Sequence, residues 1–220
     1  DAQVDHFAKA GYQATVPALP LYSMPLATTN VKNLTRFVKS FMDHMGYEKA
    51  FLVGNSLGGH IALMMQKLYP NNVHGLILAG SSGLYESAMG NSYPRRGDRD
   101  YIAERIRDVF YVKEVATEEL IDEVFATVND RNKAIKTLAI SKSAIRHNMS
   151  NDIKEFEVPT CIVWGRQDDV TPPEVADKFK DLMPNSELHW IDECGHAAMM
   201  ERPEEFNTII QKWLDKLLPN

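Results

Sequence analysis

Ala50-Phe51-Leu52-Val53-Gly54-Asn55-Ser56-Leu57-Gly58-Gly59-His60 joins a run of apolar residues to a glycine-rich turn. The apolar start predicts a short buried strand, and the apolar-rich run from Ile61 to Tyr69, closed by Pro70, predicts a helix directly after it. Between them stands the pattern G-x-S-x-G, with Ser56 at its centre. A strand that turns at once into a helix holds this serine on a sharp, strained bend and exposes its hydroxyl beyond the end of the sheet.

Two glycines and one amide define what this bend can do. We expect glycine at Gly54 and Gly58 because a Cβ atom at either position would collide across so tight a turn. The backbone N–H of Leu57 is expected to point into the space where a substrate oxyanion would form. Ser56 is therefore the candidate nucleophile, and Leu57 is the candidate oxyanion-hole donor.

Helices and strands alternate on both sides of the bend. The opening residues predict a helix closed by Gly11, and residues 12–16 predict a strand. A helix with its apolar residues at three- and four-residue spacings begins at Asn30, and residues 73–79 form another short apolar run. Alternation of this kind predicts fold class α/β, with a mostly parallel sheet flanked by helices.

The strand signals disappear between residues 84 and 152, where charged residues become more frequent. Three helices are predicted there, near residues 99–112, 117–129 and 131–146. Thr117 is a suitable N-cap for the second of them. We expect this segment to be a helical cap over the sheet.

The α/β pattern resumes after the cap. The elements predicted in order are a strand at 158–165, a helix starting at a Thr171-Pro172-Pro173-Glu174 capping box with proline at its first position, a strand at 187–191, and a last helix from Pro203. We therefore expect residues 1–83 and 153–220 to form the two parts of the core and residues 84–152 to form the cap.

Composition limits the classes of function. A chain of 220 residues with 44% hydrophobic content can bury the core of one domain. The net charge of -6 argues against nucleic acid or an anionic membrane as a partner, and no apolar run has the length of a membrane span. Cys161 and Cys194 are too few for a disulfide framework, so a reducing compartment such as the cytoplasm is expected.

Three polar side chains follow the ends of predicted strands. They are Ser56, an aspartate at Asp168 or Asp169, and His196. Loops after successive parallel strands converge on one edge of a sheet, and a serine needs a base that is itself held by an acid. The other histidines fall on predicted helices or strands or in the cap, which leaves His196 as the base. No pair of histidines has the spacing of a metal site, so no metal is predicted.

These motifs together resemble a known superfamily. G-N-S-L-G-G-H, then W-G-R-Q-D with P-P shortly after, then C-G-H followed by E-R-P-E-E-F, are similar to the motifs of the α/β-hydrolases over nearly the whole chain. The likeness is greatest to the capped branch that includes carboxylesterases and meta-cleavage-product (carbon–carbon bond) hydrolases. It implies Ser56 as nucleophile, Asp168 as acid and His196 as base, with no cofactor and a small-molecule substrate. Asp169 is then a surface or loop-capping neighbour.

The same comparison shows two departures from the family pattern. Members usually carry an earlier strand that ends in an H-G loop and donates a second oxyanion-hole N–H, and no stretch before Ser56 matches it. The loop at residues 17–25 also lacks the acidic residue and glycines that relatives commonly have. We hypothesise that an N-terminal segment with several strands is missing from this chain. An open sheet edge would also favour association, so a homo-oligomer is a possible state.

Substrate signals are few. Asn55 and Arg131 resemble carboxylate- or dienol-binding residues of the carbon–carbon hydrolases, but a turn residue and a solvated helix start explain them as well. Ala197 stands where several of those relatives have tryptophan. Candidates to line an apolar cavity under the cap are Tyr85, Met89, Tyr93, Phe110 and Tyr111, which cap packing would also require.

We predict a serine hydrolase that acts on a small carboxylic ester or a similar acyl substrate. Two alternatives remain. The same triad can cleave a carbon–carbon bond in a vinylogous diketone, as in meta-cleavage-product hydrolases. A ligand-binding protein of the same fold with little or no turnover is the other alternative, and the incomplete oxyanion hole favours it.

Overall fold

A computed structural model of the chain describes residues 2–85 and 95–218. Its sheet consists of four parallel strands in the order β1-β2-β3-β4. The strands are β1 (Ala50–Asn55), β2 (Val73–Ala79), β3 (Thr160–Gly165) and β4 (Ser186–Ile191). The predicted α/β class and parallel sheet are confirmed, and each strand lies within two residues of its predicted start and end.

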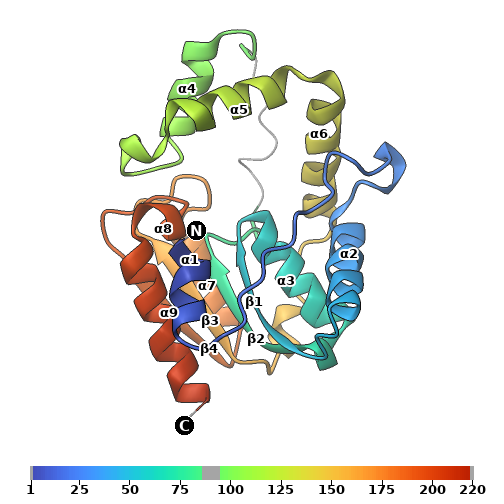
Figure 1. The fold of residues 1–220 in the computed structure, drawn as a ribbon, viewed down its shortest axis with the longest axis vertical. Helices are drawn as coiled ribbons and strands as arrows, with labels where there is room; N and C mark the ends of the chain where they lie inside the picture. Colours follow the sequence, from blue (N-terminus) through green and yellow to red (C-terminus); the bar gives the residue numbers. More distant parts are fainter. Residues whose placement is uncertain (1, 86–94, 219–220) are drawn as a thin grey trace.

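Helices cover both faces of the sheet, as Figure 1 shows. On one face lie α2 (Val31–His44), α3 (Leu57–Leu68) and α7 (Pro173–Leu182), and on the other lie α1 (Ala2–Lys9) and α9 (Pro203–Leu217). Neighbouring side chains of β2 alternate between the two layers. Leu76 and Leu78 pack with the first group, and Ile77 and Ala79 with the second. This alternation is why both faces of the strands are apolar.

The cap consists of α4 (Arg99–Arg107), α5 (Glu118–Asn129) and α6 (Arg131–Arg146). These helices lie above the end of the sheet from which β2 leads into the cap (Figure 1). Ile102, Ile106, Phe110 and Ile121 form a separate apolar cluster there. Thr117 accepts a hydrogen bond from the Leu120 amide, which confirms it as the N-cap of α5.

The first cap helix is shorter than the predicted range 99–112. It ends at Arg107, and a 3₁₀ turn, η4 (Lys113–Val115), follows. The intervening backbone bonds to the core instead, because the Val109 carbonyl accepts from the His196 amide and the Val112 amide donates to Glu201. These tertiary contacts replace hydrogen bonds that a longer helix would have made.

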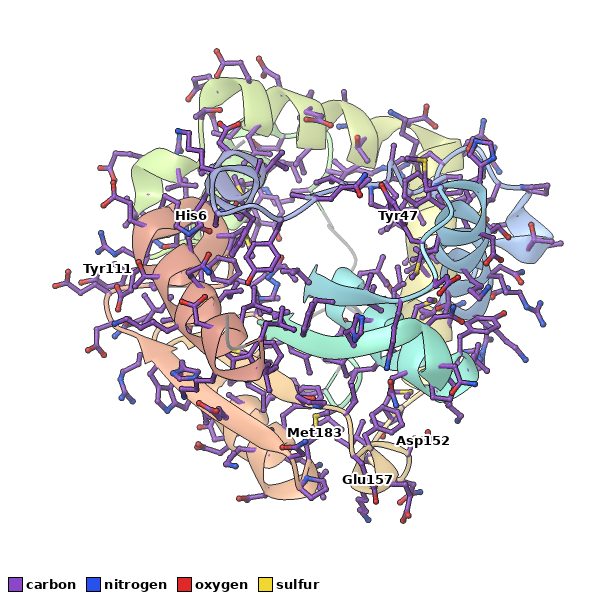
Figure 2. The ribbon with its side chains drawn as sticks, turned by 60° about the horizontal axis from the view of Figure 1, so that its bottom comes forward. His6, Tyr47, Tyr111, Asp152, Glu157 and Met183 are labelled. Carbon is purple, nitrogen blue, oxygen red and sulfur yellow. The ribbon has the colours of Figure 1, made fainter. Side chains whose placement is uncertain are left out.

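The predicted strand at residues 12–16 is wrong. The segment is extended but pairs with no strand, and β1 ends the sheet order. The Tyr12 amide donates to the Phe7 carbonyl in α1. Farther along, Gln13 Nε2 donates to Tyr47 Oη at 2.9 Å, and Thr15 Oγ1 lies 3.1 Å from the same oxygen. Tyr47 is labelled in Figure 2. The sequence has the composition of a strand, but strand formation requires a partner backbone that this segment lacks.

The capping box predicted at residues 171–174 is also wrong, although the helix start is right. Pro172 is the N-cap of α7 and makes no capping hydrogen bond, while Pro173 is the first helical residue. The Thr171 hydroxyl instead donates to Asp168. The short elements that complete the chain are η1 (Leu26–Thr28), η2 (Pro70–Asn72), η5 (Ile153–Glu155) and α8 (Ala198–Glu201).

None of the helices in residues 2–85 and 95–218 combines the length and the apolar character that crossing a membrane would need.

Candidate active site

Ser56 occupies a strained turn between β1 and α3. Its backbone has φ 51° and ψ -117°, a region that non-glycine residues avoid at a cost of about 1–3 kcal/mol. Two hydrogen bonds, one to the last residue of β2 and one to the loop after it, hold Ser56 there. The Ser56 amide donates to the Ala79 carbonyl, and the Ser56 carbonyl accepts from the Ser82 amide, each at 3.1 Å. The predicted bend is therefore confirmed.

Glycine is required on both sides of this turn, but at one position other than predicted. A Cβ atom on Gly54 would lie 2.3 Å from the Gly58 carbonyl carbon, which no real structure tolerates. A Cβ atom on Gly58 itself would meet nothing within 4 Å, so that part of the prediction is wrong. The crowded position is Gly59, where a Cβ would lie 2.2 Å from Ser81 Oγ. Gly59 thus lets α3 approach the loop after β2.

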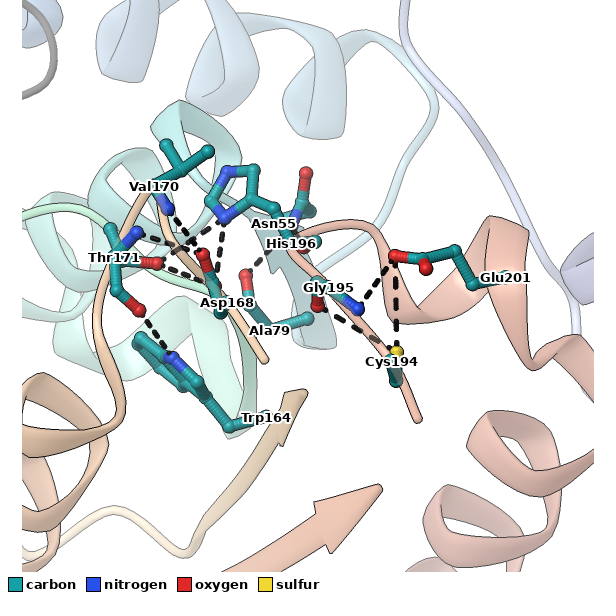
Figure 3. A network of polar contacts seen from close by, with 10 residues as sticks. All are labelled: Asn55, Ala79, Trp164, Asp168, Val170, Thr171, Cys194, Gly195, His196 and Glu201. Carbon is teal, nitrogen blue, oxygen red and sulfur yellow. Dashed lines mark hydrogen bonds and ion pairs between the residues drawn. The ribbon is translucent and has the colours of Figure 1, made fainter. Parts of the chain in front are cut away.

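Asp168 and His196 form a buried pair. His196 Nδ1 lies 2.9 Å from Asp168 Oδ2, and the two residues are 7% and 1% exposed. The amides of Val170 and Thr171 donate to Asp168 Oδ1, and the Thr171 hydroxyl donates to Oδ2 at 2.8 Å (Figure 3). A carboxylate acceptor at Nδ1 places the proton on that nitrogen and leaves Nε2 able to act as a base. The neighbouring Asp169 is exposed.

The ends of the strands converge at this pair. Asn55 Nδ2 donates to the carbonyls of Ala79 and His196, each at 3.0 Å, and so ties the end of β1 to the histidine loop. The end of β2 also passes close by. A Cβ atom on Gly80, which has φ +46°, would lie 2.9 Å from His196 Nδ1. The three predicted triad residues therefore stand on segments that contact one another.

The candidate nucleophile Ser56 and the candidate base His196 stand on segments that touch, but no hydrogen bond joins their side chains in the described residues. Within the described residues, both hydrogen bonds of the His196 ring use Nδ1, and neither involves the Ser56 hydroxyl. Such bonds are often long in unliganded enzymes and shorten when substrate binds. The Leu57 amide begins α3, where the first amides have no partner within the helix and the helix dipole is positive. The Leu57 amide can therefore donate a hydrogen bond to an anion placed at this helix end.

A comparison with known families fits this geometry. The family model described as the alpha/beta hydrolase family matches residues 2–209. The chain belongs to this family. The resemblance found in the sequence is thus shown, and the parallel sheet with a helical cap is the α/β-hydrolase fold.

Relatives of this α/β-hydrolase are found both by sequence and among solved structures. A 2-hydroxy-6-oxononadienedioate/2-hydroxy-6-oxononatrienedioate hydrolase of Pseudomonas sp. is 30% identical over 96% of this chain and 80% of its own length. A 2-hydroxy-6-oxo-6-phenylhexa-2,4-dienoate hydrolase of Burkholderia cepacia is 27% identical over 94% of this chain and 79% of its own. Among solved structures, an α/β-hydrolase enzyme from the sediment metagenome of the Mar Chica lagoon, Morocco, is 47% identical, with a TM-score of 0.81 over 99% of this chain and 84% of its own.

The candidate substrate residues do not all gather at the site of this α/β-hydrolase. Arg131 is the exposed first residue of α6. Phe110 is buried in the apolar cluster of the cap, whereas Tyr85 and Tyr111 are 42% and 45% exposed. The remaining two candidates, Met89 and Tyr93, lie outside the described residues. The side-chain NH₂ group of Asn55 already donates hydrogen bonds to two backbone carbonyls.

Sequence reasoning missed two side chains beside the triad. Thr171 was assigned to a helix cap, and its contact with Asp168 depends on the fold of the loop. Glu201 is the first residue of the E-R-P-E-E-F motif, which gives it no role of its own, yet its carboxylate is buried and accepts from the Gly195 amide next to His196. The only sequence signal for either was nearness to the triad motifs.

His60 lies one turn of α3 beyond Ser56 and is fully buried. Its Nε2 donates to the His147 carbonyl at 2.9 Å and so links the nucleophile helix to the end of α6. Desolvation by burial lowers the pKa of His60 to about 4. The ring is therefore neutral at pH 7 and serves as a structural link.

Across the residues that the structure covers, no three His, Cys, Asp or Glu side chains gather in a way that could hold a metal ion.

Proposed function

We propose that this α/β-hydrolase is a serine hydrolase that cleaves small carboxylic esters by acyl transfer. The observation that carries the proposal is the buried Asp168–His196 pair, which lies beside a serine held on a strained strand-to-helix turn. Strain of this kind persists only where the surrounding structure enforces it, and it is common at sites of catalysis. A structural role alone would leave the combination unexplained.

The reaction proceeds in two halves. His196 Nε2 takes the proton of the Ser56 hydroxyl while Ser56 Oγ forms a bond to the ester carbonyl carbon. The resulting oxyanion accepts a hydrogen bond from the Leu57 amide. The carbon–oxygen bond to the alcohol then breaks, and the imidazolium returns its proton to the leaving alkoxide. Water, deprotonated by the same imidazole, attacks the carbonyl carbon of the acyl-serine ester. The bond from that carbon to Ser56 Oγ then breaks, the imidazolium returns its proton to Oγ, and the acid is released.

The role of Asp168 in this scheme is electrostatic and orienting. Its carboxylate stabilises the imidazolium that forms during each half-reaction and keeps the ring in one tautomer. Three protein donors besides His196 hold that carboxylate in place. Because the carboxylate is already fixed before substrate arrives, little reorganisation is needed in the transition state.

Cleavage of a carbon–carbon bond is the second candidate. The names of the Pseudomonas and Burkholderia cepacia relatives favour it, since both are hydrolases of 2-hydroxy-6-oxo dienoates. Such substrates carry one or two carboxylates, which call for a cationic partner. Of the two residues that resemble substrate-binding residues of such enzymes, Asn55 donates to backbone carbonyls and Arg131 is exposed at the start of α6. We therefore place ester hydrolysis first.

One assay separates these candidates. Purified protein is given p-nitrophenyl butyrate and, separately, 2-hydroxy-6-oxo-6-phenylhexa-2,4-dienoate, and kcat/KM is measured for each. A higher value for the ester supports the proposal, and a higher value for the dienoate replaces it with the second candidate. Failure to turn over either substrate would favour a ligand-binding protein of the same fold.

A matched pair of variants tests the assignment of the acid. Asp168→Asn is expected to lower kcat by about 10⁴-fold, the effect seen when a triad aspartate is replaced by its amide. Asp169→Asn removes a carboxylate from the adjacent, exposed position and is expected to leave kcat unchanged. Equal effects of the two substitutions would contradict the assigned role of Asp168.

A further inference from the structure

A second buried carboxylate, outside the triad, lies next to the catalytic loop. Glu201, the last residue of α8, is only 7% exposed. Its Oε1 accepts from the Gly195 amide at 3.0 Å, as Figure 3 shows. Its Oε2 accepts from the amides of Tyr111 and Val112 at 2.8 and 3.0 Å. One carboxylate therefore joins the loop that carries His196 to the segment 109–112 of the cap.

The cap and the loop also touch directly through their backbones. The His196 amide donates to the Val109 carbonyl at 3.0 Å. The two segments are packed too closely to admit a side chain at Gly195. A Cβ atom there would lie 2.7 Å from the Val109 carbonyl oxygen and 2.8 Å from the Tyr111 amide nitrogen. Both residues of the pair Gly195 and His196 are therefore held by the cap.

The charge of Glu201 makes these contacts depend on one another. Taking a carboxylate out of water is unfavourable unless hydrogen bonds replace its hydration. No lysine or arginine of the described residues forms an ion pair with it. Its compensation comes from backbone amides of two segments and from the Cys194 thiol, whose Sγ lies 4.0 Å from Oε1. If either segment moves away, the buried charge loses part of its compensation, and the other segment loses a strong acceptor.

We propose that Glu201 is a positioning residue that couples the cap to the catalytic base. Its carboxylate fixes Gly195, and through it His196, only while residues 109–112 of the cap are in place. Displacement of this part of the cap therefore loosens the base. The proposal rests on the proposed function, because it assigns a role in positioning the base of that reaction. It concerns residues 109–112, Gly195, His196 and Glu201 alone.

The main test compares Glu201→Gln with Glu204→Gln. Glutamine keeps the size of the side chain, but its NH₂ group must face either the Gly195 amide or the two cap amides, so one donor always meets another donor. Glu204 lies in the first turn of α9, is exposed, and serves as the matched control. Amide hydrogen exchange is followed by mass spectrometry without substrate, and kcat and KM are measured with p-nitrophenyl butyrate.

The expected result has two parts. In Glu201→Gln, exchange rises about tenfold or more both in residues 109–112 and at Gly195 and His196, as expected when a hydrogen bond to a charged group is lost. The value of kcat falls between about ten- and a hundredfold, because small displacements of a catalytic group have effects of that order, while KM changes less than about twofold. The control variant matches wild type in both assays.

A second variant covers the case in which Glu201→Gln does not fold. Val112 has φ -81°, which proline can adopt, so Val112→Pro removes one amide donor from the cap side and leaves the carboxylate intact. Faster exchange at Gly195 and His196 in this variant supports coupling. Faster exchange confined to residues 109–112, or a kcat equal to wild type in either variant, would overturn it. Because exchange is measured without substrate, an inactive wild type would refute the proposed function and leave this test valid.

Discussion

Acidification should destabilise the folded protein through His60. The side chain is fully buried within α3 and donates to the His147 carbonyl, and burial holds its pKa at about 4 instead of 6.5. The unfolded chain therefore binds a proton at His60 at a pH where the folded chain does not. By linkage, the stability that this group provides is fully present above pH 6.5 and is lost as pH falls toward 4.

The size of the effect follows from the two pKa values. Between pH 8 and pH 5 the unfolded state gains about 2 kcal/mol from protonation of His60, using a pKa of about 4 in the folded state. The full difference, reached below pH 4, is about 3 kcal/mol. Against a total stability of roughly 5–15 kcal/mol, a loss of this size is easily measured.

Urea unfolding at pH 8 and pH 5 provides the assay, with wild type and His60→Gln side by side. Other groups titrate in the same range, but they contribute equally to both proteins and cancel in the difference. We expect the free energy of unfolding of wild type to fall by about 2 kcal/mol more than that of the variant between the two pH values. Parallel losses in the two proteins would refute the assignment of a buried, neutral His60.

Three further predictions follow from the packing of the site. Thr171→Val removes the hydroxyl that donates to the buried Asp168 and should lower stability by about 1.5–3 kcal/mol in urea unfolding; an unchanged midpoint would contradict the bond. Gly59→Ala should lower stability by at least about 1–3 kcal/mol, since its Cβ would overlap a neighbouring side chain, and thermal unfolding would show it. The thiols of Cys161 and Cys194 should resist Ellman's reagent at pH 8 in the folded protein, because burial raises the pKa of each to about 12, and they should react after unfolding in guanidinium.

The sequence was sufficient for elements whose signal is local. The apolar runs at β2 and β3 identified strands because these strands are buried on both faces. The run at β1 also marked a strand, but the predicted burial is wrong there, since β1 is the outermost strand in the sheet order, is mostly half-buried and leaves Val53 56% exposed. Thr117 was found because an N-cap bonds within its own turn. The turn at Ser56 was found for the same reason, since a strand, a short glycine-rich motif and a helix are contiguous in the chain.

The sequence was insufficient where a distant backbone decides the outcome. Residues 12–16 have strand composition but no partner, and α4 ends early because residues 109–112 bond to the histidine loop. Gly59 is crowded by Ser81, a residue of the loop after β2, so its need for glycine could not be inferred from the turn alone. Glu201 accepts from the Tyr111 amide, 90 residues away in the sequence, which no local pattern reports. The Thr171–Asp168 contact spans only three residues, but it depends on the conformation of the loop, and the sequence favoured a helix cap there instead.

Covalent labelling of the serine tests the central claim most directly. Wild type and His196→Ala are incubated with a fluorophosphonate, and the modified residue is located by peptide mass spectrometry. An activated serine forms a stable phosphonate ester only when a base removes its proton. We expect one adduct, on Ser56, in wild type and none in His196→Ala. An adduct on a different serine, or equal labelling of Ser56 in the two proteins, would contradict the account.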